Sequence, residues 1–260
     1  MKPEYLFRPT QALARFKPPP DYARLPWGAR LKINPKEAIG RAIWLKGVYD
    51  LIVTESLWRL TDSADVAVDA GANIGYMTSV LSVRAQEVHA FEPHPEVFKT
   101  LRENSLGWEN VHLYECALSN ENGRSYLSIP DEHGVNQGLA FVAAKGLSIE
   151  TMSLNALDLK VDILKLDVEG HELQLLEGAG LPGIRDIVFE EHLEYPSPVS
   201  QYLEEAGYTL FSLGQTLLGP QLFSPRQKPA RSWEPQSYVA TLEPLRVKSR
   251  FKTRGWQCLK

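Results

Sequence analysis

The stretch that most constrains the fold of this chain is Val66–Gly75, with the sequence VAVDAGANIG. Its first half is apolar and ends in Asp69, a pattern typical of a short strand that reaches the edge of a sheet. Gly71, Asn73 and Gly75 follow in a tight turn, and Gly and Asn tolerate positive φ best. Such a turn leaves backbone N–H groups uncovered at the start of a helix, within reach of a ligand. The stretch therefore predicts the nucleotide-cofactor corner of a doubly wound α/β sheet.

The spacing of the glycines and a downstream acid narrow the choice of cofactor. A second strand is expected over 87–91 and ends before Glu92, 23 positions after Asp69, where a carboxylate accepts hydrogen bonds from a ribose. A dinucleotide site needs G-x-G-x-x-G, but Tyr76 stands where the last glycine of that pattern is required, and nothing basic flanks the turn. S-adenosylmethionine has no phosphate, and its cationic groups suit a loop that follows an acid. We therefore expect S-adenosylmethionine to contact five residues: Asp69, Gly71, Asn73, Gly75 and Glu92.

Other residues are expected around the same ligand. The third strand, over 111–117, ends where an adenine would lie, so we expect a backbone contact at Ala117. Tyr49 and Thr54 are expected to close over the methionine end. Asn136 and Gly138, in a loop between two hairpin strands, are candidates for the acceptor side.

Strands and helices alternate from residue 65 onward, which favours a parallel sheet with helical crossovers. Before it, 36–60 carries apolar residues at helical spacing and predicts a helical cap over the ligand edge of the sheet, interrupted at Gly47. We expect a lead-in and cap over 1–60, a cofactor-binding domain over 61–245 and a tail over 246–260. The expected strands are 66–69, 87–91, 111–117, 163–167, 186–190, 208–213 and 238–242, with a hairpin over 124–129 and 138–142. The expected helices are 74–85, 95–104, 151–157, 172–178 and 200–206, and 219–235 is expected to be a proline-rich loop.

Composition limits the class of protein and of partner. The 260 residues, with 43% hydrophobic residues and a net charge of −4, are long enough for one sizeable core and do not favour binding to nucleic acid or an anionic membrane. No run approaches the length of a membrane-spanning helix, and the first residues lack the apolar core of a signal peptide. Cys116 and Cys258 show no metal spacing and no disulfide framework. We therefore expect a cytoplasmic protein that has no membrane span and does not bind nucleic acid.

Three separated segments resemble one known family. They are VAVDAGANIGYMTSVLS with AFEPHPEVFKTLRENS, then DILKLDVEGHELQLLEGA, and then DIVFEEH. Together they resemble the FkbM family of S-adenosylmethionine-dependent methyltransferases, as do INPKEAIGRAIWLKGVYD and SYVATLEPLR. The resemblance implies a Rossmann-like class I methyltransferase fold with a seven-stranded, mostly parallel sheet. It also implies methyl transfer to a hydroxyl oxygen of a sugar, lipid or natural product. Asn155 and Asp50 depart from the family's pattern, where Asp and Glu are common.

Methyl transfer to a hydroxyl needs a base near the methyl group, and acids follow the fourth and fifth strands. Asp167 and Glu169 follow strand 163–167, while Glu190 and His192 fall on one side of the end of strand 186–190. We predict His192 as the base, oriented by Glu190 or Asp167, with Glu169 as a further catalytic candidate. A buried ion pair of Lys165 with Asp167 or Asp162 that merely orders the strand is the structural alternative.

Three other readings of the sequence stay open. Asp167, Glu190 and His192 could bind Mg²⁺, although histidine is an unusual Mg²⁺ ligand, and we do not predict a metal. The chain could also be a nicotinamide-dependent oxidoreductase, which the broken glycine pattern and the missing Tyr-x-x-x-Lys pair disfavour. A cofactor-binding scaffold without catalysis is the third possibility, against which the acids at two strand ends argue.

Overall fold

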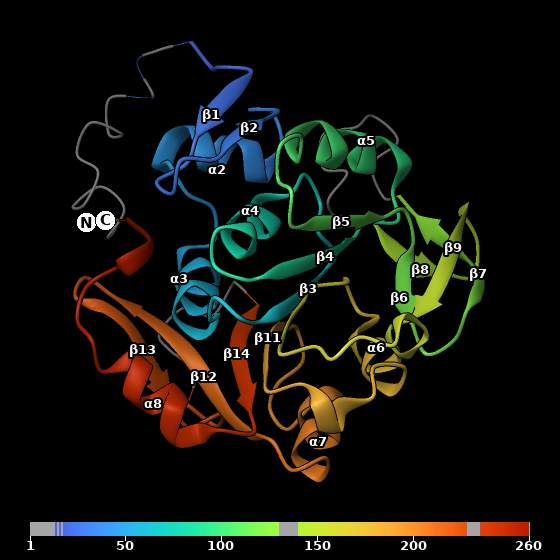
Figure 1. Cartoon of the computed structure of the whole chain (residues 1–260), viewed down its shortest axis with the longest axis vertical. Helices are drawn as coiled ribbons and strands as arrows, with labels where there is room; N and C mark the ends of the chain where they lie inside the picture. The colour runs from blue at the N-terminus through green and yellow to red at the C-terminus, as the bar shows by residue number, and fades with distance from the viewer. Residues whose placement is uncertain (1–13, 15, 17, 130–139, 228–234, 260) are drawn as a thin grey trace.

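A mixed sheet of eight strands forms the centre of the computed structural model, which describes residues 14, 16, 18–129, 140–227 and 235–259 (Figure 1). The strand order is β13-β12-β14-β11-β10-β3-β4-β5, and β14 and β13 run against the other six. This arrangement confirms the expected Rossmann-like, mostly parallel sheet. The strands are β3 (Val66–Ala70), β4 (Glu87–Phe91), β5 (Val111–Tyr114), β10 (Ile163–Leu166), β11 (Asp186–Glu191), β12 (Thr209–Thr216), β13 (Gly219–Phe223) and β14 (Gln236–Thr241).

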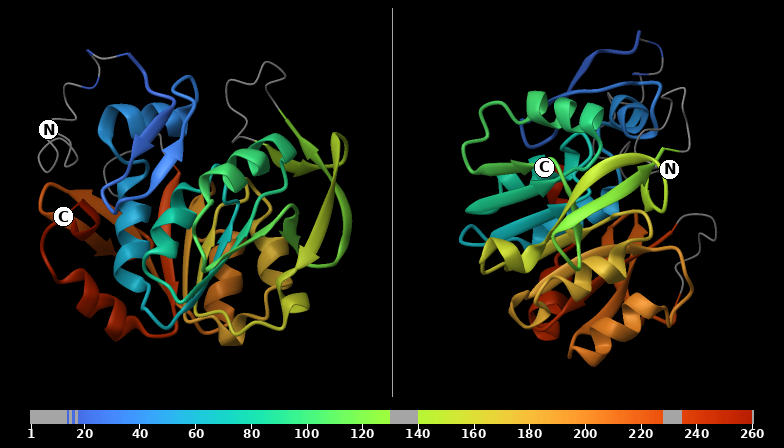
Figure 2. Two further views of the ribbon diagram at one scale, coloured as in Figure 1. Left: turned by 45° about the horizontal axis from the view of Figure 1, so that its top comes forward. Right: turned by 90° about the vertical axis from the view of Figure 1, so that its right-hand side faces the viewer.

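Helices cover both faces of this sheet because successive side chains of the buried strands point to opposite sides. One face packs on α3 (Leu51–Leu60), α4 (Tyr76–Ser82), α5 (Pro95–Asn104) and α8 (Pro244–Phe251). The other face packs on α6 (Glu172–Glu177) and α7 (Pro198–Glu205), as the two views of Figure 2 show. Ala67 and Val68 illustrate the alternation, since these neighbours belong to the cores on opposite faces. In the described part of the chain, no helix has both the length and the apolar character that a bilayer crossing requires.

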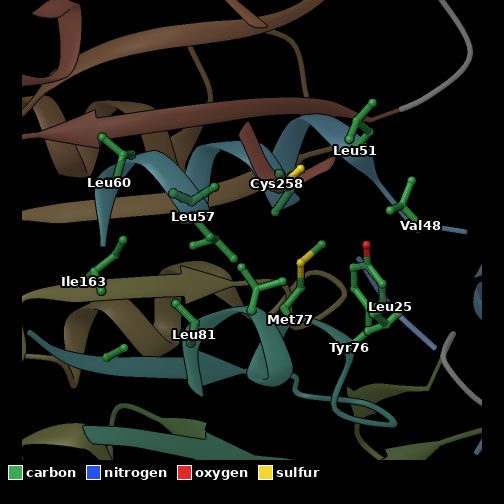
Figure 3. Close-up of a cluster of buried hydrophobic side chains, with 14 of the residues drawn as sticks. Leu25, Val48, Leu51, Leu57, Leu60, Tyr76, Met77, Leu81, Ile163 and Cys258 are labelled. Carbon is green, nitrogen blue, oxygen red and sulfur yellow. The ribbon is translucent and has the colours of Figure 1, made fainter. Parts of the chain in front are cut away.

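The segment before the sheet folds into two helices, as the spacing predicts. α2 (Ala38–Lys46) ends at Gly47, which adopts φ of 79° and lets the chain turn into α3. α3 packs on a face of the sheet, and the α2–α3 junction, with Ile39 of α2 and Val53 of α3, reaches the ligand edge. In Figure 3, Leu57 and Leu60 of α3 face Leu81 of α4 and Ile163 of β10. Cys258, in the short helix η5 (Gln257–Leu259), joins the same core, so residues before 61 and after 245 share its packing.

Two expected elements are replaced by a second sheet. The single strand expected over 111–117 is wrong, because the chain bends after β5 and continues as β6 (Ala117–Ser119) in a four-stranded sheet. The helix expected over 151–157 is wrong in its first half. β9 (Leu147–Ser153) pairs there with β6 and β7 (Gly123–Ser128), and the short helix η3 (Leu154–Leu157) follows. β8 (Phe141–Ala143) completes the hairpin that the sequence predicts. Tertiary pairing outweighs local helix preference in this segment.

The central sheet has eight strands, so the expected count of seven is wrong by one. The extra strand, β13, lies at the start of the segment expected to be a proline-rich loop. Its Pro220 is tolerated because β13 is an edge strand, where a missing N–H group breaks no central ladder. At the N-terminal side, β1 (Tyr22–Arg24) and β2 (Arg30–Lys32) form a separate small sheet, and η4 (Leu181–Gly183) precedes β11.

Candidate active site

A cleft opens at the carboxyl ends of the parallel strands, between β3 and β10. Chain connections run in opposite directions from these two strands, and ligands of open α/β sheets bind at such a switch point. The cleft holds about 1090 Å³ of empty space, part of which opens to solvent. Its walls come from the α2–α3 junction, the turn after β3, the ends of β4, β10 and β11, and the second sheet.

The glycine-rich turn after β3 forms the floor of this cleft. Gly71, with φ of 75°, passes so close to β10 that a Cβ atom would collide with the carbonyl oxygen of Asp167. Asn73 also adopts positive φ, at 50°, and its side-chain oxygen accepts a hydrogen bond from the N–H of Ile74 at 2.7 Å. Gly75 lies against Leu101 and starts α4. The predicted turn is therefore present: Gly71 and Asn73 line the cleft, while Gly75 shapes the turn from behind.

Glu92 occupies the predicted place at the end of β4 and is fixed from two sides. Its Oε2 accepts the N–H of Asn73 at 2.9 Å, and its Oε1 accepts the N–H of His94 at 2.8 Å. The side chain is buried and lines the cleft. Burial raises the pKa of Glu92 to about 7, although the two backbone donors and Lys165 oppose the shift. Both carboxylate oxygens are thus held beside the cofactor turn.

A buried lysine joins the two central strands beneath the cleft. Lys165 Nζ lies 3.3 Å from Asp69 and 3.4 Å from Asp167, and it donates a 2.9 Å hydrogen bond to the Gly71 carbonyl. Burial alone would lower the pKa of Lys165, but the two carboxylates raise it, and the net shift is upward. Asp69 is fully buried behind the wall, where it accepts a hydrogen bond from the Thr78 hydroxyl at 2.6 Å. The ion pair of Lys165 with Asp167 that the sequence left as an alternative is therefore present.

Four carboxyl groups gather at the other end of the cleft, from Asp50, Asp167, Glu169 and Glu190. Glu190 is hydrogen-bonded to Asp50, the residue that caps the start of α3. Burial and the charge of Asp50 raise the pKa of Glu190 to about 11, so the pair holds a proton at neutral pH. Burial and Asp167 also raise the pKa of Glu169, which adopts φ of 52°. This end of the cleft is consequently acidic and partly protonated.

His192 lies outside this group of carboxyl groups. Its side chain is 62% exposed, and its Nε2 is 3.9 Å from Glu169 Oε2. The carboxylate near His192 is therefore that of Glu169, which lines the cleft, whereas the sequence analysis paired His192 with Glu190 or Asp167. A different histidine, His171, lines the cleft, and its Nε2 lies 2.9 Å from the Ser119 hydroxyl.

Of the remaining residues predicted to contact the cofactor, two line the cleft and one supports the lining from behind. Tyr49 and Ala117 line the cleft, and burial raises the pKa of Tyr49. Thr54 is buried behind it, where its hydroxyl donates to the Tyr49 carbonyl at 2.9 Å and lies 3.2 Å from the Tyr76 hydroxyl. Thr54 therefore holds the two tyrosines in place. Asn136 and Gly138 fall outside the described residues.

Sequence reasoning missed several residues of the wall. Asp50 was noted only as a departure from a family pattern, and its contact with Glu190 joins positions 140 residues apart. The apolar wall of the second sheet, which includes Leu127 and Val142, was also missed because that sheet was only partly predicted. Lys165 did carry a signal, since a lone lysine within an apolar strand indicates a buried partner.

Known proteins resemble the chain over most of this architecture. Residues 69–210 match the family model described as the methyltransferase FkbM domain. The hexuronic acid methyltransferase AglP of Haloferax volcanii is 32% identical over 190 residues, which cover 69% of this chain and 77% of that protein. The 31-O-demethyl-FK506 methyltransferase FkbM of Streptomyces tacrolimicus is 31% identical over 170 residues, which cover 49% of this chain and 65% of that protein.

Two solved structures that the chain resembles each cover more than 80% of it. A precorrin 8W decarboxylase from Methanobacterium thermoautotrophicum is 20% identical, covers 81% of this chain and 96% of its own, and gives a TM-score of 0.46. TYW2 of M. jannaschii, in complex with AdoMet, is 16% identical, covers 83% and 82%, and gives a TM-score of 0.45.

The family match spans the turn after β3, Glu92, the end of β10 and the end of β11, which are the elements that surround the cleft. It therefore identifies the fold as a class I methyltransferase fold and the methyl donor as S-adenosylmethionine, in place of a nicotinamide cofactor or a scaffold without chemistry. The chain belongs to the FkbM family of S-adenosylmethionine-dependent methyltransferases.

Proposed function

We propose that the protein transfers a methyl group to a hydroxyl oxygen of a small-molecule acceptor, a sugar, lipid or natural product. The observation that carries the proposal is the group of four carboxyl groups at one end of the cleft, one of which, Glu169, lies 3.9 Å from His192. A hydroxyl is a weak nucleophile until its proton leaves, so an oxygen acceptor needs proton-accepting groups there. The names of the two relatives, which refer to a hexuronic acid and to 31-O-demethyl-FK506, support the same acceptor class.

The residues of the cleft fit S-adenosylmethionine on two observations. Gly71 has no room for a Cβ atom against the Asp167 carbonyl, so the chain there is bare backbone, and it lines the cleft. Glu92 presents both carboxylate oxygens where a ribose diol would donate to them. We assign ribose binding to Glu92, backbone contacts to Gly71, Asn73 and Ala117, and closure over the methionine end to Tyr49. Asp69, Gly75 and Thr54 support the turn and the closing tyrosine from behind.

When bound, the donor supplies an already activated methyl group, so the protein's task is to align the acceptor and remove its proton. We assign proton acceptance to His192, with Glu169 as the carboxylate that orients it and stabilises its charged form. Glu190 is protonated at neutral pH, so it would donate a hydrogen bond to the acceptor. Asp167, held by Lys165, would accept one. The two groups would thus fix the hydroxyl beside the base.

A comparison of three variants tests the proton acceptor. His192→Ala should lower kcat by about 100-fold or more and remove the rise of rate with pH that a histidine base produces. Glu190→Gln should have a much smaller effect, because a neutral amide resembles a protonated carboxyl group. Glu191→Gln is the matched control, since this neighbour points away from the cleft, and its kcat should be unchanged.

The binding of S-adenosylhomocysteine, followed by calorimetry, should be the same in all three variants. A near-native kcat and an unchanged pH profile in His192→Ala would contradict the assignment and move it to Asp167 or Glu169.

Mass spectrometry of reactions with hydroxyl-bearing sugars, glycolipids and natural products tests the acceptor class. We expect the accepted compound to gain one methyl group on a hydroxyl oxygen, and among the sugars we expect this compound to be a hexuronic acid. An RNA preparation belongs in the same panel, and methylation of RNA alone would overturn the small-molecule proposal.

The free, buried thiols of Cys116 and Cys258 support our proposal that the protein works in the reducing cytoplasm.

A further inference from the structure

Three metal-ligating side chains meet on the sheet at the end opposite the active-site cleft. Glu87 and His89 are two positions apart on β4, so they project from the same face. His112 on β5 is the register partner of His89 in the parallel pair and projects from that face as well. Figure 1 shows β5 beside β4 at the edge of the sheet. The strand pairing itself therefore brings the three groups together.

The ligand atoms of these side chains converge on one point. Glu87 Oε1 lies 3.1 Å from His89 Nε2 and 3.0 Å from His112 Nε2. All three atoms lie within 4.8 Å of one another. The two imidazole rings stack with centroids 4.9 Å apart, so both Nε2 atoms are turned toward the same carboxylate. Two ligand atoms of a tetrahedral zinc site are separated by about 3.3 Å, given bonds of about 2.0–2.1 Å.

His89 is the buried member of the three residues. Its side chain is only 4% exposed, and the Glu87 carboxylate, 3.1 Å from its Nε2, does not form an aligned hydrogen bond with it. A metal ion between this nitrogen and the carboxylate would satisfy both groups. The other ring nitrogen, Nδ1, lies 3.0 Å from the Tyr114 hydroxyl. A hydrogen bond from Nδ1 to that oxygen would leave the Nε2 lone pair free for a metal.

We propose that Glu87, His89 and His112 form a zinc-binding site. Two imidazole nitrogens and one carboxylate oxygen are a ligand set that Zn²⁺ favours, whereas Mg²⁺ prefers oxygen. Tyr114 orients the buried ligand. Because the His112 side chain is 51% exposed and that of Glu87 is 37% exposed, water completes the coordination. The ion ties the edge strand β5 to β4 and does not touch the cofactor cleft.

The test uses the full-length protein, first stripped with EDTA and then titrated with ZnCl₂ in a calorimeter. We expect one equivalent of Zn²⁺ to bind, and CoCl₂ to give the intense d–d absorption of a four-coordinate ion. Glu87→Gln and His112→Ala alter partly exposed side chains, so the fold should persist, and each should weaken Zn²⁺ binding at least about 100-fold. Tyr114→Phe should weaken it about tenfold, as expected for a group that orients a ligand.

His192→Ala is the control, because His192 is also exposed and also near a glutamate. It should leave Zn²⁺ affinity unchanged. The proposal is overturned if no stoichiometric Zn²⁺ binds, or if Glu87→Gln and His112→Ala bind it as tightly as the unaltered protein. Loss of binding in His192→Ala alone would overturn it as well, because the ion would then belong to the active-site acids.

Discussion

At the scale of the residue, Glu92 shows how burial and preorganisation act on one carboxyl group. Two backbone N–H groups hold its two oxygens in place before any ligand binds, so little conformational freedom remains to be lost on binding. Burial nevertheless favours the protonated form, and the pKa of about 7 lies above the ordinary value for glutamate. The same residue is therefore well positioned for a ribose but only partly ionised at neutral pH.

This pKa predicts that cofactor affinity depends on pH. A carboxylate accepts hydrogen bonds from both ribose hydroxyls, so binding below pH 7 must first release the proton that the folded protein holds on Glu92. Affinity for S-adenosylhomocysteine should be highest above pH 7 and fall by up to about tenfold per pH unit below it. Calorimetry in buffers of different ionisation enthalpy would measure the released proton.

Glu92→Gln should remove the pH dependence. It should also lower affinity at pH 8 at least tenfold, because charge-assisted hydrogen bonds of about 1.5–3 kcal/mol each are weakened. An affinity that does not change with pH in the unaltered protein would contradict the assignment of Glu92.

At the scale of the element, α3 holds the C-terminal segment against the sheet. Arg59 and Glu55, one turn apart on α3, form a buried ion pair with a distance of 2.6 Å. Arg59 also donates to the carbonyl groups of Arg250, Thr253 and Gly255, while Glu55 accepts the backbone N–H groups of Gln257 and Cys258. The pair therefore satisfies backbone groups that would otherwise be buried without partners.

Removal of one member of this pair should be strongly destabilising. Arg59→Met would leave the Glu55 carboxylate and three carbonyl groups without their donor, at a cost of about 3–5 kcal/mol in the free energy of unfolding. Urea denaturation would measure the loss. Arg41→Met, at an exposed position of α2, is the matched control and should change stability by less than about 0.5 kcal/mol. Equal stability of the two variants would show that the buried pair contributes nothing.

At the scale of the whole molecule, the sheet separates the catalytic end from the proposed zinc site. Glu87 begins β4 and Glu92 follows the end of that strand five residues later, which corresponds to about 16 Å of extended chain. The acids of the cleft lie at the carboxyl ends of the strands, while the zinc ligands begin at the opposite end of β4. Metal removal should therefore affect stability and turnover differently.

We expect EDTA to leave the methyl-transfer rate unchanged and Zn²⁺ addition to raise the melting temperature of the metal-free protein, because a ligand that binds the folded state stabilises it. Both quantities can be measured on one metal-free sample before and after addition of ZnCl₂. If EDTA abolishes turnover and Mg²⁺ restores it, a metal acts among Asp167, Glu190 and His192.

The parts of the structure that could be predicted from the sequence are those that depend on local conformation. The turn at Gly71 and Asn73 needs positive φ, which few residue types adopt, so the cofactor corner could be predicted from residue type alone. The strand β4 and the helix α5 begin and end at the predicted residues, because apolar periodicity and Pro95 at the first turn specify them. The place of Glu92 follows from these two elements.

Which side chains meet and which are buried follows from the packing of the whole chain and could not be predicted from the sequence. The proton shared by Asp50 and Glu190, the exposure of His192 and the meeting of His89 with His112 depend on register and packing between distant segments. The same holds for β13 and for the second sheet, whose strands exist because partners lie beside them. Local preference fixes the conformation of a turn or a helix end, but burial and strand pairing are properties of the whole chain, and these set the pKa values and contacts on which the chemistry depends.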